Sequence, residues 1–292
     1  MPVISSMTDK MKNCLIIILM IAFATVCCHA KPVNRALVIG LGKQEDRNWA
    51  KINGDNDVRF VTKMLEGWNY TDISILKNET ATKKGIIEAL ISLTRRCRIG
   101  DNVYIHYSGH GQLITDLNGD EATRWNGWHA QWDESIIPYD AYMNYCSKDH
   151  GEKHITDDEL GSYLAQIRSK IGRKGEMIVV LDACHSGDAT QGEQDETVRG
   201  VDTKFNIPRT PGTLQEARIP EQWLTISACQ PYQLCTEIKA KKMGKLTYAI
   251  CAMGHSLLRL GNKDMEYHLE QFLKRYEGRL PQSPMVTGRK RY

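Results

Sequence analysis

Short apolar runs alternate along this chain with segments whose apolar residues recur at helical spacing, and this alternation limits the fold more than any other feature. A continuous apolar run of about four to eight residues is typical of a strand buried on both faces. Strands separated by helices predict βαβ units, so we expect an α/β fold with a mostly parallel central sheet and helices on both faces. The expected strands are Ala36–Leu41, Thr71–Leu76, Val103–Tyr107, Met177–Leu181 and Trp223–Ala228.

One expected helix, Ile155–Ile171, carries its own start signal. Thr156 and Glu159 form a capping box, in which two side chains satisfy free backbone N–H groups of the first turn. Apolar residues then recur along one helical face. The other expected helices are Val58–Trp68, Ile86–Leu93, Leu246–Leu260 and Met265–Tyr276.

Two stretches break this alternation. Leu113–Trp132 is polar and rich in Gly, Asp and Trp, which predicts a surface loop. Gly187–Glu221 has no periodicity and predicts a long mobile loop. A structureless segment of that length inside a compact domain is unusual, and is commonly functional or a linker.

Residues 1–30 have the layout of a secretory signal peptide. Basic residues precede the apolar run Leu15–Val26, which is followed by Cys28-His29-Ala30 before the expected cut. The run is shorter than the roughly 18–20 residues that span a bilayer, so stable membrane insertion is not expected. An uncleaved anchor and a lipid-modified Cys27 are the alternatives. We therefore expect a mature chain that begins near Lys31 and is secreted or held in the cell envelope.

Composition excludes several classes of protein. Of 292 residues, 41% are hydrophobic and 25% are charged, as in ordinary globular proteins. The net charge of +3 is too small to indicate a nucleic-acid partner. Cys14, Cys27 and Cys28 fall in the signal peptide, which leaves six of the nine cysteines. An even number permits disulfides, but six without a CxxC pair do not require them.

Two expected strands end in residues suited to nucleophilic catalysis. One runs into Tyr107-Ser108-Gly109-His110-Gly111 and another into Asp182-Ala183-Cys184-His185-Ser186-Gly187. Ligands bind beyond the carboxyl ends of parallel strands, so His110 and Cys184 should meet at one edge of the sheet. An imidazole that takes the proton of a thiol creates a nucleophilic thiolate, and nearby backbone N–H groups can hold an oxyanion.

Each residue also has a plainer interpretation. A cysteine after an apolar strand is commonly inert, and a histidine there is commonly only hydrogen-bonded. A metal site is a second alternative, with ligands from His106, His110, Asp182, Cys184 and His185. Side chains alternate along a strand, so Cys184 and His185 should point apart, which disfavours a metal.

The two motifs resemble the histidine and cysteine motifs of the metacaspases, within the caspase-like (clan CD, C14) cysteine peptidases. The resemblance covers residues 35 to 288. The caspase signature has Gln two positions before the cysteine, where this chain has Asp182, and this favours a metacaspase over an Asp-cleaving caspase. Further matching segments are Ala36–Gly40, Asn56–Val58, Asp133–Pro138, Ser227–Gln230, Lys245–Ala249 and Gln282–Pro284.

The resemblance implies a caspase-like α/β/α sandwich over residues 31–292. Its parts would be a large-subunit-like region 31–199, a linker within 187–221 and a small-subunit-like region 222–292. It also implies roles for the two motifs. His110 is the general base and acid, Cys184 is the nucleophile, and the backbone N–H groups of Gly111 and Cys184 form the oxyanion hole.

The resemblance further implies a pocket for the side chain before the cut, lined by Asp57, Ser108 and Asp182. Two carboxylates in a closed pocket attract Arg or Lys, because an unpaired buried charge is costly. Asp57 has an alternative role as a helix N-terminal cap.

No cofactor is expected to be required, and calcium is the one candidate ion. Some metacaspases bind calcium, and the matching carboxylates are Asp133, Asp157 and Asp158. Calcium takes six to eight oxygen ligands, which clustered acids, carbonyls and water can supply. Alternatively, Asp157 and Asp158 only favour the N-terminus of their helix.

We therefore expect a secreted cysteine endopeptidase that cuts protein or peptide substrates after Arg or Lys. We also expect it to cut its own loop after Arg199 or Lys204, which would open the cleft. A non-enzymatic caspase-like module that binds partners and a metal-dependent hydrolase are the alternatives. The intact pair of His110 and Cys184 argues against a module, and loss of activity on thiol alkylation would exclude a metal hydrolase.

Overall fold

A six-stranded, mostly parallel sheet forms the centre of the fold. The computed structural model describes residues 31–121, 132–184, 197–208, 220–230, 233–276 and 280–291, and Val33–Tyr292 form one compact unit. The strand order is β11-β8-β7-β3-β1-β2, and only β11 runs antiparallel to its neighbour. This confirms the predicted α/β class. The strands are β1 (Asn34–Gly40), β2 (Asp72–Lys77), β3 (Asn102–Ser108), β7 (Met177–Asp182), β8 (Leu224–Ser227) and β11 (Met285–Gly288).

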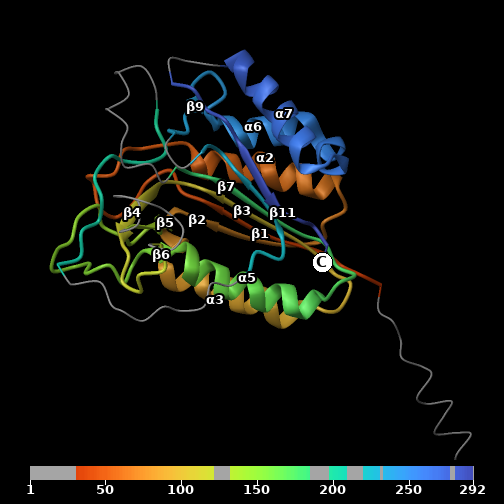
Figure 1. Cartoon of the computed structure of the whole chain (residues 1–292), viewed down its shortest axis with the longest axis horizontal. Coiled ribbons are helices and arrows are strands. Elements are labelled where there is room, and N and C mark those ends of the chain that lie inside the picture. The colour runs from red at the N-terminus through yellow and green to blue at the C-terminus, as the bar shows by residue number, and fades with distance from the viewer. Residues whose placement is uncertain are drawn as a thin grey trace, which may run out of the picture. The chain divides into compact units, whose positions relative to one another are not determined.

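Helices cover both faces of this sheet (Figure 1). One face carries α2 (Gly54–Gly67), α6 (Lys245–Met253) and α7 (Asn262–Leu273), and the other carries α3 (Lys83–Arg96) and α5 (Asp157–Ile171). Successive side chains of a strand point to opposite faces, so a strand covered on both sides must be apolar throughout. In β1, Ala36 and Val38 enter the core on one face, whereas Leu37 and Ile39 enter the core on the other.

The helix ends follow local signals. α5 begins at Asp157, two residues after the predicted start, because the Thr156 side chain caps it by accepting a hydrogen bond from the Glu159 N–H at 3.2 Å, and Ile155 and Thr156 pair as a short strand instead. The helix predicted to reach Leu260 ends instead at Met253. Gly254, with φ of 66°, caps α6 in the left-handed region, and a 3-10 helix follows.

A second, three-stranded antiparallel sheet lies beside the candidate site. It consists of β4 (Gly111–Thr115), β5 (Trp132–Ile136) and β6 (Ile155–Thr156), and a short hairpin elsewhere pairs β9 (Glu237–Ile238) with β10 (Met243–Gly244). The predicted surface loop over Leu113–Trp132 is therefore wrong at its start, where residues 113–115 are buried in β4. Three residues are too few to produce a periodic signal, and residues 122–131 lie outside the described ranges.

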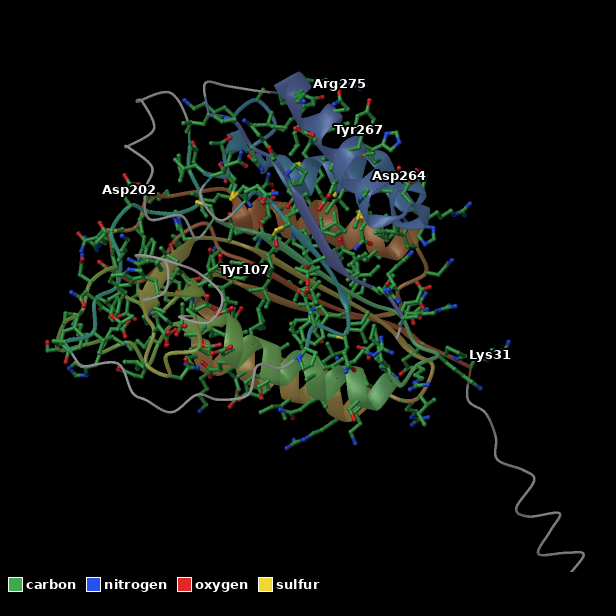
Figure 2. All side chains as sticks on the ribbon, viewed as in Figure 1. Lys31, Tyr107, Asp202, Asp264, Tyr267 and Arg275 are labelled. Carbon is green, nitrogen blue, oxygen red and sulfur yellow. The ribbon has the colours of Figure 1, made fainter. Side chains whose placement is uncertain are left out.

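Side chains fill the space between the sheet and the helices (Figure 2). Tyr107 on β3 is 1% exposed, whereas Tyr267 on α7 is 59% exposed. Among the described residues, no helix combines the length and apolar character needed to cross a membrane. The predicted signal peptide, residues 1–30, lies outside the described ranges.

Candidate active site

The carboxyl ends of β3 and β7 bring the histidine and cysteine motifs together. The two strands pair in parallel with Ser108 opposite Asp182. The Gly109 N–H also donates a hydrogen bond to the carbonyl oxygen of Asp182 at 3.3 Å. Ser108 and Asp182 end their strands, and His110 and Cys184 each follow two positions later. The register therefore places both residues at one edge of the sheet.

One carbonyl oxygen accepts hydrogen bonds from both motifs. The Gly111 N–H donates to the carbonyl oxygen of Arg199 at 3.4 Å, and the Cys184 N–H donates to the same oxygen at 3.0 Å. The next residue, Gly200, lies so close to the thiol that an added Cβ would overlap Cys184 Sγ. The Arg199–Gly200 peptide group thus lies against the candidate nucleophile. Two N–H groups converging on one carbonyl oxygen are what acyl transfer needs to stabilise an oxyanion.

His110 is fully buried and is oriented by the chain before α2. Its Nε2 lies 2.8 Å from the carbonyl oxygen of Ala50, so Nε2 carries the hydrogen, and the Trp49 ring packs 5.0 Å from the imidazole centroid. Its Nδ1 has no hydrogen-bond partner among the described residues. Burial lowers the pKa of His110 to about 4. The ring is therefore neutral at pH 7, with Nδ1 available to accept a proton.

The side chain of Arg199 is fully buried among three carboxylates. Its Nη2 lies 2.7 Å from Asp57 Oδ2 and 2.8 Å from Glu237 Oε1, and its Nη1 lies 3.4 Å from Asp182 Oδ2. Nη1 donates to Ser108 Oγ at 2.5 Å, and the Ser108 hydroxyl donates to Asp57 Oδ2 at 2.5 Å. The three residues that the sequence assigns to the pocket thus surround one guanidinium.

The start of α6 supports two of these carboxylates. Asp182 Oδ2 accepts hydrogen bonds from the Thr247 N–H at 2.8 Å and the Thr247 hydroxyl at 2.6 Å. The Gly244 N–H lies 3.3 Å from both carboxylate oxygens of Asp57. The first N–H groups of a helix have no partner within the helix, so carboxylates at that end are stabilised.

Asp57 lies inside the first turn of α2 and does not cap it, because the N-cap position belongs to Asn53. Burial raises the pKa of Asp57 to about 6; the Arg199 cation opposes this rise and the charge of Asp182 adds to it. Asp57 therefore changes charge near pH 6 while Arg199 occupies the pocket.

Two functional groups of the site, one in the acidic pocket and one beside His110, were not predicted from the sequence. Glu237 is the third carboxylate, but it lies in a two-residue strand without a motif of its own. The Asn53 N–H donates to its Oε1 at 2.7 Å, and the Asn53 side-chain amide donates to its Oε2. Ala50 acts through its backbone carbonyl, so its role does not depend on its side chain and leaves no motif in the sequence. An acidic residue shortly before the Lys245–Ala249 motif was the only available signal for Glu237.

The residues before Gly200 pair with a strand segment, as an extended peptide does when it is added to a sheet edge. The Arg199 N–H donates to the carbonyl oxygen of Cys235 at 2.9 Å, and the Glu237 N–H donates to that of Thr197 at 3.0 Å. Val198 and Thr236 form the antiparallel bridge between these bonds.

The residues after the Arg199–Gly200 bond run alongside β4. The Phe205 N–H donates to the carbonyl oxygen of Leu113 at 2.8 Å, and the Phe205 side chain is fully buried with Ile114 and Ile207. The prediction of a mobile loop is thus wrong for residues 197–208. The segment is held by the ion pairs of Arg199 and by short stretches of backbone hydrogen bonding, and neither produces a periodic pattern in the sequence. Residues 185–196 and 209–219 lie outside the described ranges.

The two candidate self-cleavage residues lie in different surroundings. Arg199 fills the acidic pocket, whereas Lys204 Nζ lies 5.3 Å from the centroid of the Trp132 ring. Of the two peptide bonds, only Arg199–Gly200 has its carbonyl oxygen on the Gly111 and Cys184 N–H groups.

A separate acidic cluster contains Asp133, one of the three predicted calcium residues, whereas Asp157 and Asp158 act on it only through their charge. Asp116, Asp120 and Asp133 each offer an oxygen within 4.8 Å of the others. Burial raises the pKa of Asp133 to about 9, and the charges of Asp116, Asp157, Asp158 and Asp120 raise it further. Oδ2 of Asp116 and Oδ1 of Asp133 are buried without a hydrogen-bond partner among the described residues. An oxygen-only set with orphaned carboxylate oxygens fits calcium. Sequence reasoning missed Asp116 and Asp120.

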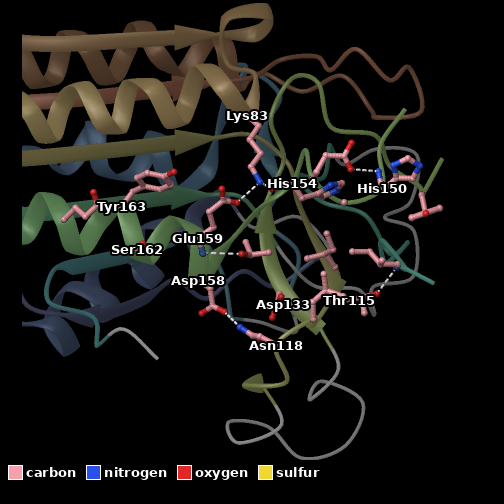
Figure 3. A pocket seen from close by; sticks show the side chains of 18 residues that line it. Lys83, Thr115, Asn118, Asp133, His150, His154, Asp158, Glu159, Ser162 and Tyr163 are labelled. Atoms are coloured by element: carbon pink, nitrogen blue, oxygen red, sulfur yellow. Dashed lines mark hydrogen bonds and ion pairs between the residues drawn. The ribbon is translucent and has the colours of Figure 1, made fainter. Parts of the chain in front are cut away.

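A cavity of about 960 Å³ lies beside this cluster (Figure 3). Asp133 and Asp158 contribute to its lining, and His110 and Cys184 do not. Lys83 Nζ lies 2.6 Å from Glu159 Oε2, which holds the lysine side chain at the wall. The cavity is thus a feature distinct from the strand-end motifs.

The metal alternative finds no support at the strand ends. His106 Nε2 lies 3.1 Å from Thr247 Oγ1, whose hydrogen is donated to Asp182, so His106 supports the acidic pocket. In the parts of the chain that the structure describes, the acidic cluster is the only group of three or more metal-ligand side chains. His185 lies outside those parts. None of the six described cysteines forms a disulfide, and Cys229 Sγ donates to Cys235 Sγ at 3.4 Å.

Comparison with known proteins agrees with this geometry. The sequence model of the metacaspase, peptidase C14 domain matches residues 34–192, more than half of the chain. The chain belongs to the metacaspase family. Metacaspase-1 of Meyerozyma guilliermondii is 28% identical over 189 residues, which are 61% of this chain and 41% of that protein. Metacaspase-1 of Debaryomyces hansenii is 29% identical over 196 residues, 64% of this chain and 40% of that protein.

This metacaspase therefore spans about two fifths of the length of these curated relatives. A crystal structure of a Geobacter sulfurreducens protein shares its fold, with a TM-score of 0.59 and 20% identity. The alignment covers 88% of this chain and 94% of that one. The fold likeness extends past residue 192 and supports the caspase-like arrangement over most of the chain.

Proposed function

We propose that this metacaspase is a cysteine endopeptidase that cuts after Arg or Lys, with Cys184 as the nucleophile and His110 as the general base and acid. The observation that carries the proposal is the position of Arg199. Its guanidinium contacts Asp57, and its carbonyl oxygen accepts hydrogen bonds from Gly111 and Cys184. One residue thus meets both a pocket for a basic side chain and a pair of oxyanion donors.

The proposed reaction uses His110 for proton transfer, the Cys184 thiol for attack, and two backbone N–H groups for the oxyanion. Nδ1 of His110 takes the proton of Cys184, and the thiolate attacks the carbonyl carbon of the substrate's basic residue. The Gly111 and Cys184 N–H groups stabilise the negative oxygen of the tetrahedral intermediate. His110 then returns the proton to the leaving amine, and a thioester remains. Water hydrolyses this thioester, with His110 again accepting a proton, and the thiol is restored.

A panel of fluorogenic peptides that differ only in the residue before the cut tests this proposal. Arg and Lys peptides should exceed the Asp peptide by at least about a thousandfold in kcat/KM, which is roughly 4 kcal/mol. Asp182→Asn should remove most of that preference. Strong cleavage after Asp would refute the specificity. A non-enzymatic module would cut no peptide, and a metal hydrolase would survive thiol alkylation but lose activity on chelation.

We propose further that the chain cuts itself between Arg199 and Gly200. The pocket contacts of Arg199 favour this bond over the one after Lys204. With an N-terminus near Lys31, fragments of about 19 and 11 kDa are expected, in proportion to 33.2 kDa over 292 residues. Cys184→Ala should stay whole. Cleavage of that purified variant at the same bond would exclude self-processing.

We propose calcium as a ligand of the acidic cluster, held by Asp116, Asp120 and Asp133 with help from Asp157 and Asp158. A bound cation would neutralise these crowded carboxylates. Calorimetric titration with calcium, and with magnesium for comparison, tests this proposal. Heat of binding that persists in Asp133→Asn would place the ion elsewhere.

We propose lastly that the protein is secreted or held in the cell envelope after loss of residues 1–30. The support is the signal-peptide layout of the sequence. Expression of the full chain in a secreting host, followed by N-terminal sequencing, should give a mature end near Lys31. Retention of residues 1–30 on the extracted protein would favour the anchor alternative.

A further inference from the structure

We propose that Glu237 makes this pocket select arginine over lysine before the cut. The inference rests on the proposed cleavage after basic residues, and it names which basic residue the pocket takes. Glu237 is neither part of the histidine and cysteine motifs nor one of the pocket residues that the family resemblance implies. Its role follows from its position along the bound guanidinium.

Glu237 contacts Nε, the guanidinium nitrogen whose place is taken by a methylene in lysine. Its Oε1 accepts hydrogen bonds from Nε of Arg199 at 3.1 Å and from Nη2 at 2.8 Å. Asp57 accepts only from Nη2, and Asp182 meets only Nη1. The side of the guanidinium that carries Nε is therefore read by Glu237 alone among the described residues.

A lysine in the same pocket would place a methylene where arginine has Nε. Its ammonium would lie near the guanidinium carbon, within reach of Asp57 and Asp182. Glu237 would then face a carbon atom and lose one of its charged donors. A buried carboxylate that loses a donor is costly, and sites built to bind a donor strongly reject ligands without it. Arginine should therefore be favoured by about tenfold to a hundredfold.

The carboxylate of Glu237 is held in place, so it cannot turn to follow a lysine. The Asn53 N–H donates to Oε1 at 2.7 Å, and the Asn53 side-chain amide donates to Oε2. The Glu237 backbone is fixed as well, because its N–H donates to the carbonyl oxygen of Thr197 at 3.0 Å. A carboxylate fixed at both oxygens discriminates by geometry as well as by charge.

The test compares two fluorogenic peptides built on the chain's own segment, acetyl-Thr-Val-Arg-aminomethylcoumarin and its Lys counterpart. The wild type should favour the Arg peptide by about tenfold or more in kcat/KM. Glu237→Met, which keeps the length of the side chain but has no acceptor, should bring the ratio to about threefold or less. Most of the change should be lost activity on the Arg peptide. Glu237→Gln, with one carbonyl oxygen shared between Asn53 and the guanidinium, should fall between.

Asp182→Asn and Asp57→Asn are the matched controls, since both should weaken cleavage of the two peptides together and change their ratio by less than about threefold. Thermal unfolding of each variant separates loss of fold from loss of contact, and Glu237→Gln replaces Glu237→Met if the latter unfolds. Equal cleavage of both peptides by the wild type overturns the inference alone. An unchanged ratio in the Glu237 variants does the same. If the wild type cuts neither peptide, the proposed function fails, and the inference with it.

Discussion

Oδ2 of Asp57 lies 2.7 Å from Nη2 of Arg199, although the two residues are 142 positions apart in the sequence. The contact joins the first turn of α2 to the segment that follows the cysteine motif. It pairs two buried charges that would each be costly alone. Through this contact the chain fills its own acidic pocket and lays its own peptide bond on Cys184.

Loss of either motif residue should abolish cleavage. Cys184→Ala removes the nucleophile, and His110→Ala removes the base that activates it. We expect kcat/KM on an Arg peptide to fall by at least about a thousandfold in each variant, as when members of a catalytic set are removed. Cys146→Ala, which changes a half-buried thiol outside both motifs, should keep wild-type activity. More than a few per cent of activity in Cys184→Ala or His110→Ala would contradict the assignment.

Self-cleavage should slow as the pH drops through about 6. Burial raises the pKa of Asp57 to about 6, so the carboxylate is charged above that pH and loses its charge, and the ion pair with Arg199, below it. The pKa of His110, lowered to about 4 by burial, places loss of the base at lower pH. We expect the first-order rate, followed on gels, to fall about tenfold per pH unit below 6. In Asp57→Asn the rate should be slower and independent of pH between about pH 5 and 7. If the rate of this variant still falls below pH 6, the pH dependence belongs to another group.

A side chain at position 200 should block self-cleavage. An added Cβ at Gly200 would overlap Cys184 Sγ, and relieving such an overlap typically costs about 1–3 kcal/mol. Gly200→Ala should therefore slow the cut by about tenfold or more. Gly161→Ala is the matched control, because a Cβ at Gly161 on α5 meets no atom within 4 Å. Equal rates in the two variants would mean that the bond approaches the thiol in another way.

Removal of one acid should leave the stability of the calcium-free protein unchanged and weaken the response to calcium. With its pKa raised to about 9, Asp133 carries a proton near pH 7 in the calcium-free protein, so the equally neutral Asp133→Asn should not lower the melting temperature. Calcium at about a hundred times its Kd should raise the wild-type Tm by about 5–10 °C, and the variant's Tm much less. Asp264→Asn, in the first turn of α7, should respond as the wild type does. An equal calcium shift in Asp133→Asn would exclude Asp133 as a ligand.

The central sheet was largely predictable because its signal is local. The inner parallel strands β1 and β7 are buried on both faces, so Ala36–Leu41 and Met177–Leu181 form continuous apolar runs in the sequence. The catalytic motifs stand at the ends of such runs, which places His110 and Cys184 at one edge without any further information. β11 was not predicted, because it has only four residues, Met285–Gly288, which pair antiparallel at the edge of the sheet with only one side chain buried.

The pocket was only partly predictable, because much of it is made by contacts between distant segments. Glu237 and the Ala50 carbonyl gain their roles from partners far away in the chain, and neither position differs locally from an ordinary surface residue. The burial of Arg199 was also not predictable from its local sequence. A charged residue in an aperiodic segment predicts exposure, yet three carboxylates and Ser108 bury it completely.

The position of β8 has a consequence for the fate of a cut chain. β8 and β11 come after Arg199 in the sequence, but β8 pairs with β7, and α6 and α7 share one apolar core with α2. A break at Arg199–Gly200 would leave two polypeptides that both contribute strands to one sheet. Their separation would expose that apolar core to water, at a free-energy cost of about 25 cal/mol per Å² of apolar surface. The nicked molecule should therefore elute from a sizing column at the volume of the intact chain, and come apart only when denatured. Cleavage would then free the chain ends at Arg199 and Gly200, while the two polypeptides stay together in one folded molecule.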